Sequence, residues 1–166
     1  DNSLEPAESA SRLYNKDGTL YFSGFPIMPK QYEQIHGSFL DDIGTTKIYL
    51  PVRSALEQTQ FFQDDTTRLA PVSGSLKSFS IRPGIITADF TLDIGFEKIK
   101  AGDIYSGTAV LIEKQNLDFT ADADHHMGTV AFTGSNQLAP GDIYSLYVEA
   151  STDPSGTTYF YWNAIY

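Results

Sequence analysis

Cysteine is absent from this chain of 166 residues. Disulfide bonds, thiolate metal sites and a cysteine nucleophile are therefore excluded, while either redox compartment stays open because both tolerate a chain without cysteine. A chain of this length fits one domain and buries about 70% of its unfolded surface. A hydrophobic core can thus hold the fold together without cross-links.

Positive charge is also scarce. Lys and Arg number 11 against 21 Asp and Glu, which gives a formal net charge of −10. Nucleic-acid binding requires clustered Lys and Arg to neutralise phosphates, so we expect no nucleic-acid partner.

Long apolar runs and a secretory leader are missing as well. No stretch approaches the roughly 20 apolar residues of a membrane span, so we expect no membrane insertion. The N-terminus lacks the basic and apolar regions of a signal peptide. The chain starts at Asp1 instead of Met, as expected of a fragment, a processed product or an incompletely traced chain.

Signatures of catalysis are absent too, because the sequence has no Gly-x-Ser-x-Gly, no phosphate-binding loop and no His-Glu-x-x-His. Asp89, Asp93 and Glu97 would share one face of a strand, with Asp103 beyond, and paired carboxylates about 5 to 9.5 Å apart can serve a glycosidase. Carboxylates also belong on the wet face of a half-buried strand, and we adopt this interpretation. We predict a protein that is not an enzyme and needs no cofactor.

Asp122, Asp124, His125 and His126 bring two carboxylates and two imidazoles together in sequence. Such groups can bind a divalent ion. Adjacent His side chains point to opposite sides of an extended chain, however, and the spacing matches no fixed ligand pattern. We therefore predict a solvated loop without a metal; if a metal does bind, these four residues are the candidate ligands. The isolated His36 is expected in a turn.

Short strands separated by turn residues dominate what is present. Phe90, Leu92 and Ile94 alternate with polar residues, which predicts a strand with one dry and one wet face. About eight to ten strands without an amphipathic helix predict an all-β fold, an antiparallel β-sandwich, with a jelly roll as the preferred topology. Strands are expected at residues 46–52, 56–62, 66–72, 76–81, 88–97, 104–112, 117–120 and 129–133. Core positions are expected at Phe90, Leu92, Ile94, Leu146 and Val148.

The last 26 residues predict a β-hairpin, with strands at 141–150 and 158–166 around a turn at Asp153-Pro154-Ser155-Gly156. The opening Gly-Asp-Ile-Tyr-Ser at 141–145 also occurs at 102–106. Each copy is expected to start a strand. The repetition is a trace of two related halves or a coincidence in a chain rich in turns and tyrosine.

Aromatic residues are concentrated near the C-terminus, on both faces of the predicted last strand. One core cannot bury rings on both faces, so some must meet another subunit or form a platform on which sugar rings stack. For Trp162 a place in the core is a further alternative. The interface or glycan-binding candidates are Tyr159, Tyr161, Trp162 and Tyr166.

The N-terminal part lacks a core of its own. Residues 1–10 form an acidic arm, and strands at 11–15 and 19–24 flank the Asp-Gly turn, followed by a linker with two prolines at 25–30. We expect an attachment segment at 1–30, an irregular connection or short strand at 31–45, and the sandwich at 46–166. Candidate attachment residues are Leu13, Tyr14, Leu20, Tyr21 and Phe22.

Several short motifs in this order resemble a β-sandwich module of virion structural proteins from tailed phages, notably marine and cyanobacterial ones. The hairpin at 12–24 is similar to hairpins of phage fibre and tail-appendage proteins. The module motifs are Tyr49-Leu50-Pro51-Val52-Arg53, Arg68-Leu69-Ala70-Pro71, Gly74-Ser75-Leu76, Ile81-Arg82-Pro83, Gly141-Asp142, the residues 151–156 and Trp162.

The resemblance implies a non-enzymatic structural protein of a phage or large DNA virus, located in the virion. It would be displayed on the particle as a capsid decoration or as a tail or fibre tip component. Its partners would be sister subunits, as a homotrimer, and other virion proteins. The alternative is a carbohydrate-binding module that recognises a host-surface glycan through exposed aromatic residues.

Overall fold

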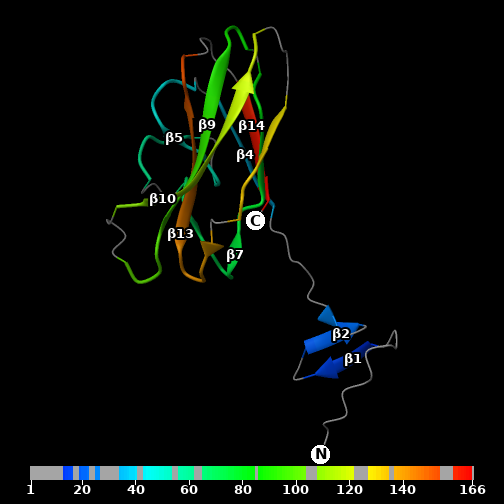
Figure 1. Ribbon diagram of the computed structural model, residues 1–166. Helices are drawn as coiled ribbons and strands as arrows, with labels where there is room; N and C mark the ends of the chain where they lie inside the picture. Colours follow the sequence, from blue (N-terminus) through cyan, green and yellow to red (C-terminus); the bar gives the residue numbers. More distant parts are fainter. Residues whose placement is uncertain are drawn as a thin grey trace, which may run out of the picture. The chain divides into compact units, whose positions relative to one another are not determined.

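The computed structural model describes residues 13–16, 19–22, 25–26, 34–40, 43–53, 56–61, 65–84, 86–103, 108–121, 127–134, 137–153 and 159–165. Within these ranges every regular element is a β-strand, and all strand pairs are antiparallel. The predicted all-β, antiparallel class is confirmed. The chain divides into two compact units, Asp1–Tyr32 and Glu33–Tyr166 (Figure 1).

The first unit contains a sheet of three short strands in the order β1-β2-β3. β1 (Leu13–Lys16) pairs with β2 (Thr19–Phe22), as the hairpin prediction requires, although the Asp-Gly turn itself lies outside the described residues. β3 (Phe25–Pro26) adds to β2 where a linker was expected. A proline is tolerated there because β3 is an edge strand, where its missing N–H need not pair.

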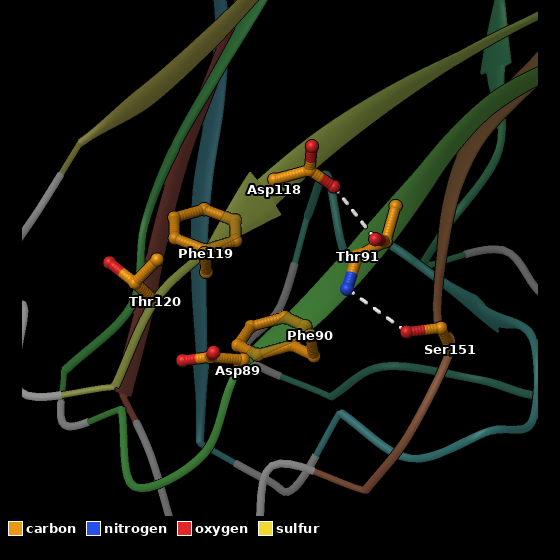
Figure 2. A pocket seen from close by; sticks show the side chains of 7 residues that line it. All are labelled: Asp89, Phe90, Thr91, Asp118, Phe119, Thr120 and Ser151. Atoms are coloured by element: carbon orange, nitrogen blue, oxygen red, sulfur yellow. Dashed lines mark hydrogen bonds between the residues drawn. The ribbon is translucent and has the colours of Figure 1, made fainter.

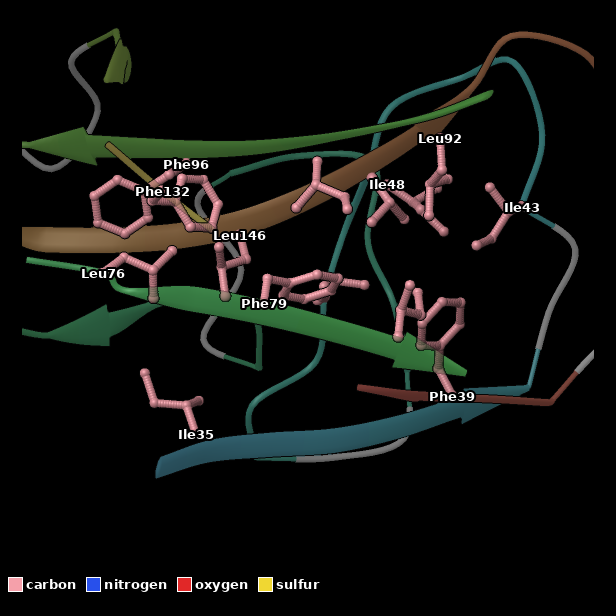
Figure 3. Close-up of a cluster of buried hydrophobic side chains, with 14 of the residues drawn as sticks. Ile35, Phe39, Ile43, Ile48, Leu76, Phe79, Leu92, Phe96, Phe132 and Leu146 are labelled. Atoms are coloured by element: carbon pink, nitrogen blue, oxygen red, sulfur yellow. The ribbon is translucent and has the colours of Figure 1, made fainter. Parts of the chain in front are cut away.

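The second unit consists mainly of two sheets that face each other across a shared core (Figures 1 and 3). One sheet has the order β10-β9-β13-β5, with β6 also paired to β13, and the other has the order β11-β8-β14-β4. A small sheet joins β12 to β7. The strands are β4 Gln34–Leu40, β5 Ile48–Tyr49, β6 Arg68–Leu69, β7 Gly74–Ser75, β8 Ser78–Arg82, β9 Phe90–Ile99, β10 Val110–Phe119, β11 Gly128–Ala131, β12 Gln137–Leu138, β13 Ile143–Ala150 and β14 Tyr159–Ile165.

The core lies between the two sheets and is built by alternating residues (Figure 3). From one sheet come Leu92 of β9 and Leu146 of β13, and from the other come Phe39 of β4 and Phe79 of β8. Full burial of such a side chain stabilises the fold by about 1.5–3 kcal/mol. The predicted core residues are all buried: Phe90, Leu92, Ile94, Leu146 and Val148.

The C-terminal hairpin prediction is wrong. β13 pairs with β9, β5 and β6, whereas β14 pairs with β4 and β8 in the other sheet. Both strands carry the expected extended conformation, but the connection between them crosses from one sheet to the other. An alternating strand can bury its apolar face either in the same sheet as the preceding strand or in the facing sheet. The alternation itself does not distinguish the two arrangements.

The connection expected at 31–45 contains a full strand, so the sandwich begins earlier than predicted. β4 pairs with β14 over its whole length, from Gln34 opposite Ile165 to Leu40 opposite Tyr159. Ile35 and Phe39 point into the core (Figure 3). His36 therefore lies within a strand and not in a turn. Gly37 occupies the middle position of this inward row, which hides the period of two from the sequence.

Two predicted strands, 104–112 and 117–120, are replaced by the single strand β10. β10 begins at Val110, and residues 104–107, where the first copy of the Gly-Asp-Ile-Tyr-Ser motif was expected to start a strand, lie outside the described residues. A register irregularity between Leu111 and Glu113 shifts the alternation within β10. One strand with such a bulge reads in sequence as two.

The wet face predicted for β9 is partly wrong, because Gly95, Glu97 and Ile99 on that face are buried. Ile99 packs with Tyr49, Phe61 and Tyr147 in a second, smaller apolar cluster, and the Tyr147 ring also lies against Gly95. Of the strands predicted at 46–52 and 56–62, the structure retains β5 and an isolated bridge between Tyr49 and Gln58.

Candidate functional site

The strands β9, β10 and β13 meet at a small open pocket of about 320 Å³ (Figure 2). Asp89, Phe90 and Thr91 come from the start of β9, where the chain enters the sheet, and Asp118, Phe119 and Thr120 come from the end of its antiparallel neighbour β10. Ser151, directly after β13, completes the lining. Antiparallel pairing thus brings residues about 30 positions apart in sequence to one site.

Two aromatic rings form the floor of the pocket. Phe90 and Phe119 stand opposite each other in the register of β9 and β10, and their rings are stacked with centroids 5.1 Å apart. Both rings are buried. They support the pocket from inside the core and leave no open aromatic face on which a sugar ring could stack.

Hydrogen bonds hold the polar rim in place (Figure 2). The Thr91 hydroxyl donates to Asp118 Oδ1 at 2.7 Å, and the Thr91 backbone N–H donates to Ser151 Oγ at 3.0 Å. Asp89 Oδ1 accepts from the backbone N–H of Ala121 at 2.7 Å. The rim therefore presents two carboxylates and several hydroxyls in fixed positions, a set that suits a ligand rich in hydroxyl groups.

The predicted metal candidates Asp122, Asp124, His125 and His126 follow Ala121 in sequence and lie outside the described residues. Within the ranges that are described, no three side chains of His, Cys, Asp or Glu are grouped so that they could hold a metal ion.

No helix among the described residues is long and apolar enough to cross a membrane.

The carboxylates considered for catalysis are separated by their partners. Asp93 accepts from Lys114 and Asn116 at 2.6 Å each, while Glu97 lies buried on the covered outer face of β9. Asp103 is an exposed turn residue. The two carboxylates of the β9 face, Asp93 and Glu97, and the turn residue Asp103 thus occupy different surroundings.

Glu97 organises a buried polar group that sequence spacing could not reveal. Its carboxylate accepts from Lys47 Nζ at 2.6 Å and from the Tyr49 hydroxyl at 2.7 Å. The Lys47 ammonium also lies 4.1 Å from the centre of the Tyr147 ring. Lys47, Tyr49 and Tyr147 each lie about 50 positions from Glu97 in sequence. No local pattern therefore indicates that they meet Glu97.

Burial and the Glu97 carboxylate both raise the pKa values of Tyr49 and Tyr147. Burial raises the pKa of Tyr49, and the hydrogen bond to Glu97 and its charge raise it further. Burial likewise raises the pKa of Tyr147 to about 12, with added repulsion from Glu97, Asp93 and Glu149. Both phenols therefore stay protonated at neutral pH. The polar group around Glu97 stabilises the outer face of the sheet at β9.

The two copies of the Gly-Asp-Ile-Tyr-Ser motif share a turn but differ beyond it. Gly102 and Gly141 both adopt positive φ, at 87° and 89°, a conformation that favours glycine. Asp103 is exposed, whereas Asp142 is buried and accepts from Lys98 Nζ and from the backbone N–H groups of Ala101 and Ala139. The second aspartate thus ties both turns together.

The aromatic interface candidates lie on β14, beside β4. Tyr159, Tyr161 and Trp162 pair in register with Leu40, Ser38 and Gly37. The Tyr161 side chain is 56% exposed, and Tyr166 lies outside the described residues. Neither β4 (QIHGSFL) nor β14 (YFYWNAI) contains Asp, Glu, Lys or Arg. Together they form a charge-free margin of the sandwich.

The attachment candidates all lie on the first two strands. Leu13 and Tyr14 belong to β1, and Leu20, Tyr21 and Phe22 belong to β2. The Phe22 side chain is 49% exposed and Tyr21 is half-buried.

No family model matches the chain, and no curated protein matches it. The functional conclusion therefore depends on the geometry of these residues.

Proposed function

We propose that this chain is a non-enzymatic structural subunit of a virion, displayed on the particle surface as a capsid decoration or as a tail or fibre tip component. The observation that carries the proposal is the division into a small three-stranded unit, Asp1–Tyr32, and a larger sandwich unit, Glu33–Tyr166. A two-part chain of this kind suits a protein that is anchored by one part and displayed by the other.

The sandwich unit is, in this proposal, a jelly roll. The strand order supports it: β4, β14, β8 and β11 form one sheet, and β5, β13, β9 and β10 form the other. Among these eight strands, those that follow one another along the chain alternate between the sheets except at β9 and β10, as in two interlocked Greek keys. Jelly rolls occur in viral capsid proteins and in lectins, so this topology favours both candidate functions without deciding between them.

The first unit is the proposed attachment device. Its strands are two to four residues long, and such a sheet has little core of its own. The exposed Phe22 ring offers apolar area for contact with sister subunits or other virion proteins. Several copies acting together would offset the entropy lost when each segment is ordered, and a trimer supplies them.

Binding to the cognate particle tests this proposal. The full chain and a chain without residues 1–32 are mixed with particles that lack the protein, and bound protein is quantified after sedimentation. The full chain should bind, and the shortened chain should stay in solution with an unchanged β-type circular dichroism spectrum. Equal binding of both chains would place the anchor on the sandwich and refute the attachment role.

Carbohydrate binding is the second candidate, and the pocket at β9 and β10 favours it. Its fixed carboxylates and hydroxyls match the hydroxyl groups of a sugar. A glycan array probed with the full chain should show binding that Asp118→Asn weakens and that Asp103→Asn, in an exposed turn, does not change. Binding that is lost in neither variant would move the glycan site to the exposed Tyr161.

A further inference from the structure

The outer edge of β4 differs from the other margins of the sandwich. β4 lies at the end of the four-stranded sheet, and no described strand pairs with its far side. It is seven residues long, pairs with β14 without a register shift, and contains neither charge nor proline. Such an edge exposes a row of backbone N–H and C=O groups and is a template for another strand.

The other three margins carry features that block pairing. β10 has an irregular register between Leu111 and Glu113 and bears Lys114 and Asp118. β5 is two residues long, and β11 is four. Short strands, bulges and edge charges are the means by which β-proteins prevent edge-to-edge association. β4 lacks all of them.

We propose that β4 pairs with β4 of a second copy of this chain, so that two four-stranded sheets join into one continuous sheet across a two-fold axis. This pairing does not depend on a role in a virion. An isologous contact of this kind uses the same surface on both subunits and closes on itself as a dimer.

The alternation of β4 determines which registers are possible. Ile35 and Phe39 face the core, and His36 and Ser38 are exposed on the opposite face. Antiparallel partners must keep their buried sides on one face, so inward residues stand opposite inward residues. The register with full overlap places Ile35 opposite Phe39 of the partner subunit and His36 opposite Ser38 of the partner subunit.

The distribution of charge makes this margin the place where a second copy can approach. Each chain carries a formal net charge of −10, so most contacts between two copies are repulsive. β4 and β14 form a margin without charged residues, and exposed Tyr161 stands beside Ser38 on this margin. Depletion of charge and the presence of Tyr are typical of the central part of a protein interface. Added salt should strengthen the dimer because it screens the remaining repulsion.

A charged residue on the edge tests the contact. Sedimentation equilibrium of the full chain should show a dimerisation step, which joins monomers into dimers or trimers into hexamers. The Kd of this step should rise at least about tenfold in Ser38→Lys, because a lysine at an edge opposes pairing. Ala131→Lys is the matched control, because Ala131 is exposed on β11, at the opposite margin of the same sheet. The dimer Kd of this variant should be unchanged. A chain that gives no dimer, or equal weakening in both variants, overturns the proposal.

Cysteine cross-linking tests the register without depending on the folding of Ser38→Lys. The chain has no cysteine, so introduced thiols have no native competitor. Directly opposite residues in an antiparallel pair are about 4.5–5.5 Å apart at Cα, within the range of a disulfide. His36→Cys/Ser38→Cys should form a covalent dimer under mild oxidation, and each single variant should not. Cross-linking in a single variant, or none in the double variant, contradicts the proposed register.

Discussion

Leu92 and Thr91 are neighbours on β9 that face opposite sides of the sheet. Leu92 is fully buried between the two sheets, while Thr91 lies at the rim of the pocket and donates to Asp118. Leu92→Ala should lower the free energy of unfolding by about 2–5 kcal/mol, because it leaves a cavity in the core. Thr91→Ala should lower it by less than about 1 kcal/mol, since one exposed hydrogen bond is lost. Chemical denaturation measures both, and equal losses would mean that the assigned faces are wrong.

Gly95 is required by a close approach, not by its φ angle. A Cβ atom at this position would overlap the ring of Tyr147, which lies over the outer face of β9. Gly95→Ala should therefore destabilise the fold by about 1–3 kcal/mol, as overpacking does. Gly44→Ala, where a Cβ would meet no atom closer than 4.0 Å, is the control and should have little effect on the melting temperature. A silent Gly95→Ala would show that the tyrosine ring moves aside freely.

The burial of the core-facing residues of β9 could be predicted from the sequence, but the burial of its outward-facing residues could not. Phe90, Leu92 and Ile94 alternate with polar residues, and alternation is a local property that one strand displays alone. Gly95 lies under the ring of Tyr147, and Glu97 bonds to Lys47 and Tyr49, so the groups that bury these two residues come from distant parts of the chain. Such covering leaves no trace in the period of the strand that is covered.

Asp142 joins the turn after β9 to the turn before β13, and its charge makes this junction sensitive to acid. Burial alone would raise its pKa, but hydrogen bonds from Ala139, Lys98 and Ala101 and the charge of Lys98 lower it below the ordinary value. A lowered folded-state pKa means that the contribution to stability is present above about pH 4, where the unfolded chain is ionised, and is lost as the pH falls through the folded pKa.

Asp142→Asn should lower the free energy of unfolding by about 3 kcal/mol at pH 7, because it leaves the Lys98 ammonium without its charged partner. The difference between the two proteins should shrink as the pH falls below about 4. Urea unfolding at several pH values measures it. Asp103→Asn, the exposed counterpart in the first copy of the motif, is the control; a difference that is constant with pH would exclude an ionic role for Asp142.

Among the elements, the long strands could be predicted and their partners could not. β9 and β13 carry dense apolar alternation, so their positions in sequence are evident. β14 was assigned to β13 by adjacency, although pairing with β4 and β8 buries the same strand in the other sheet. β4 was missed as a full strand because Gly37 interrupts its apolar row, and β10 was divided because its bulge at Leu111 shifts the alternation.

For the whole molecule, composition predicts an N-terminal segment at residues 1–30, which contain too few apolar groups for a core, and the structure divides the chain after Tyr32. The pocket at Asp89 and Asp118 could not be predicted, because it depends on the register between β9 and β10. The sequence indicated the aromatic margin at Tyr161, but its lack of charge becomes meaningful once β4 lies beside it.

We propose that this protein acts by assembling with copies of itself. Two contacts are proposed in different parts of the chain: one between first units, with three-fold symmetry, and one between β4 edges, with two-fold symmetry. If both close, they generate a hexamer with D3 symmetry. Loss of the three-fold contact alone would leave dimers, and loss of the β4 contact alone would leave trimers.

Native mass spectrometry of the full chain at micromolar concentration separates these states. We expect a hexamer that dissociates through dimers and trimers, with Ser38→Lys shifted to trimers and Ala131→Lys unchanged. A protein that remains monomeric at every concentration and salt strength would contradict the proposed assembly.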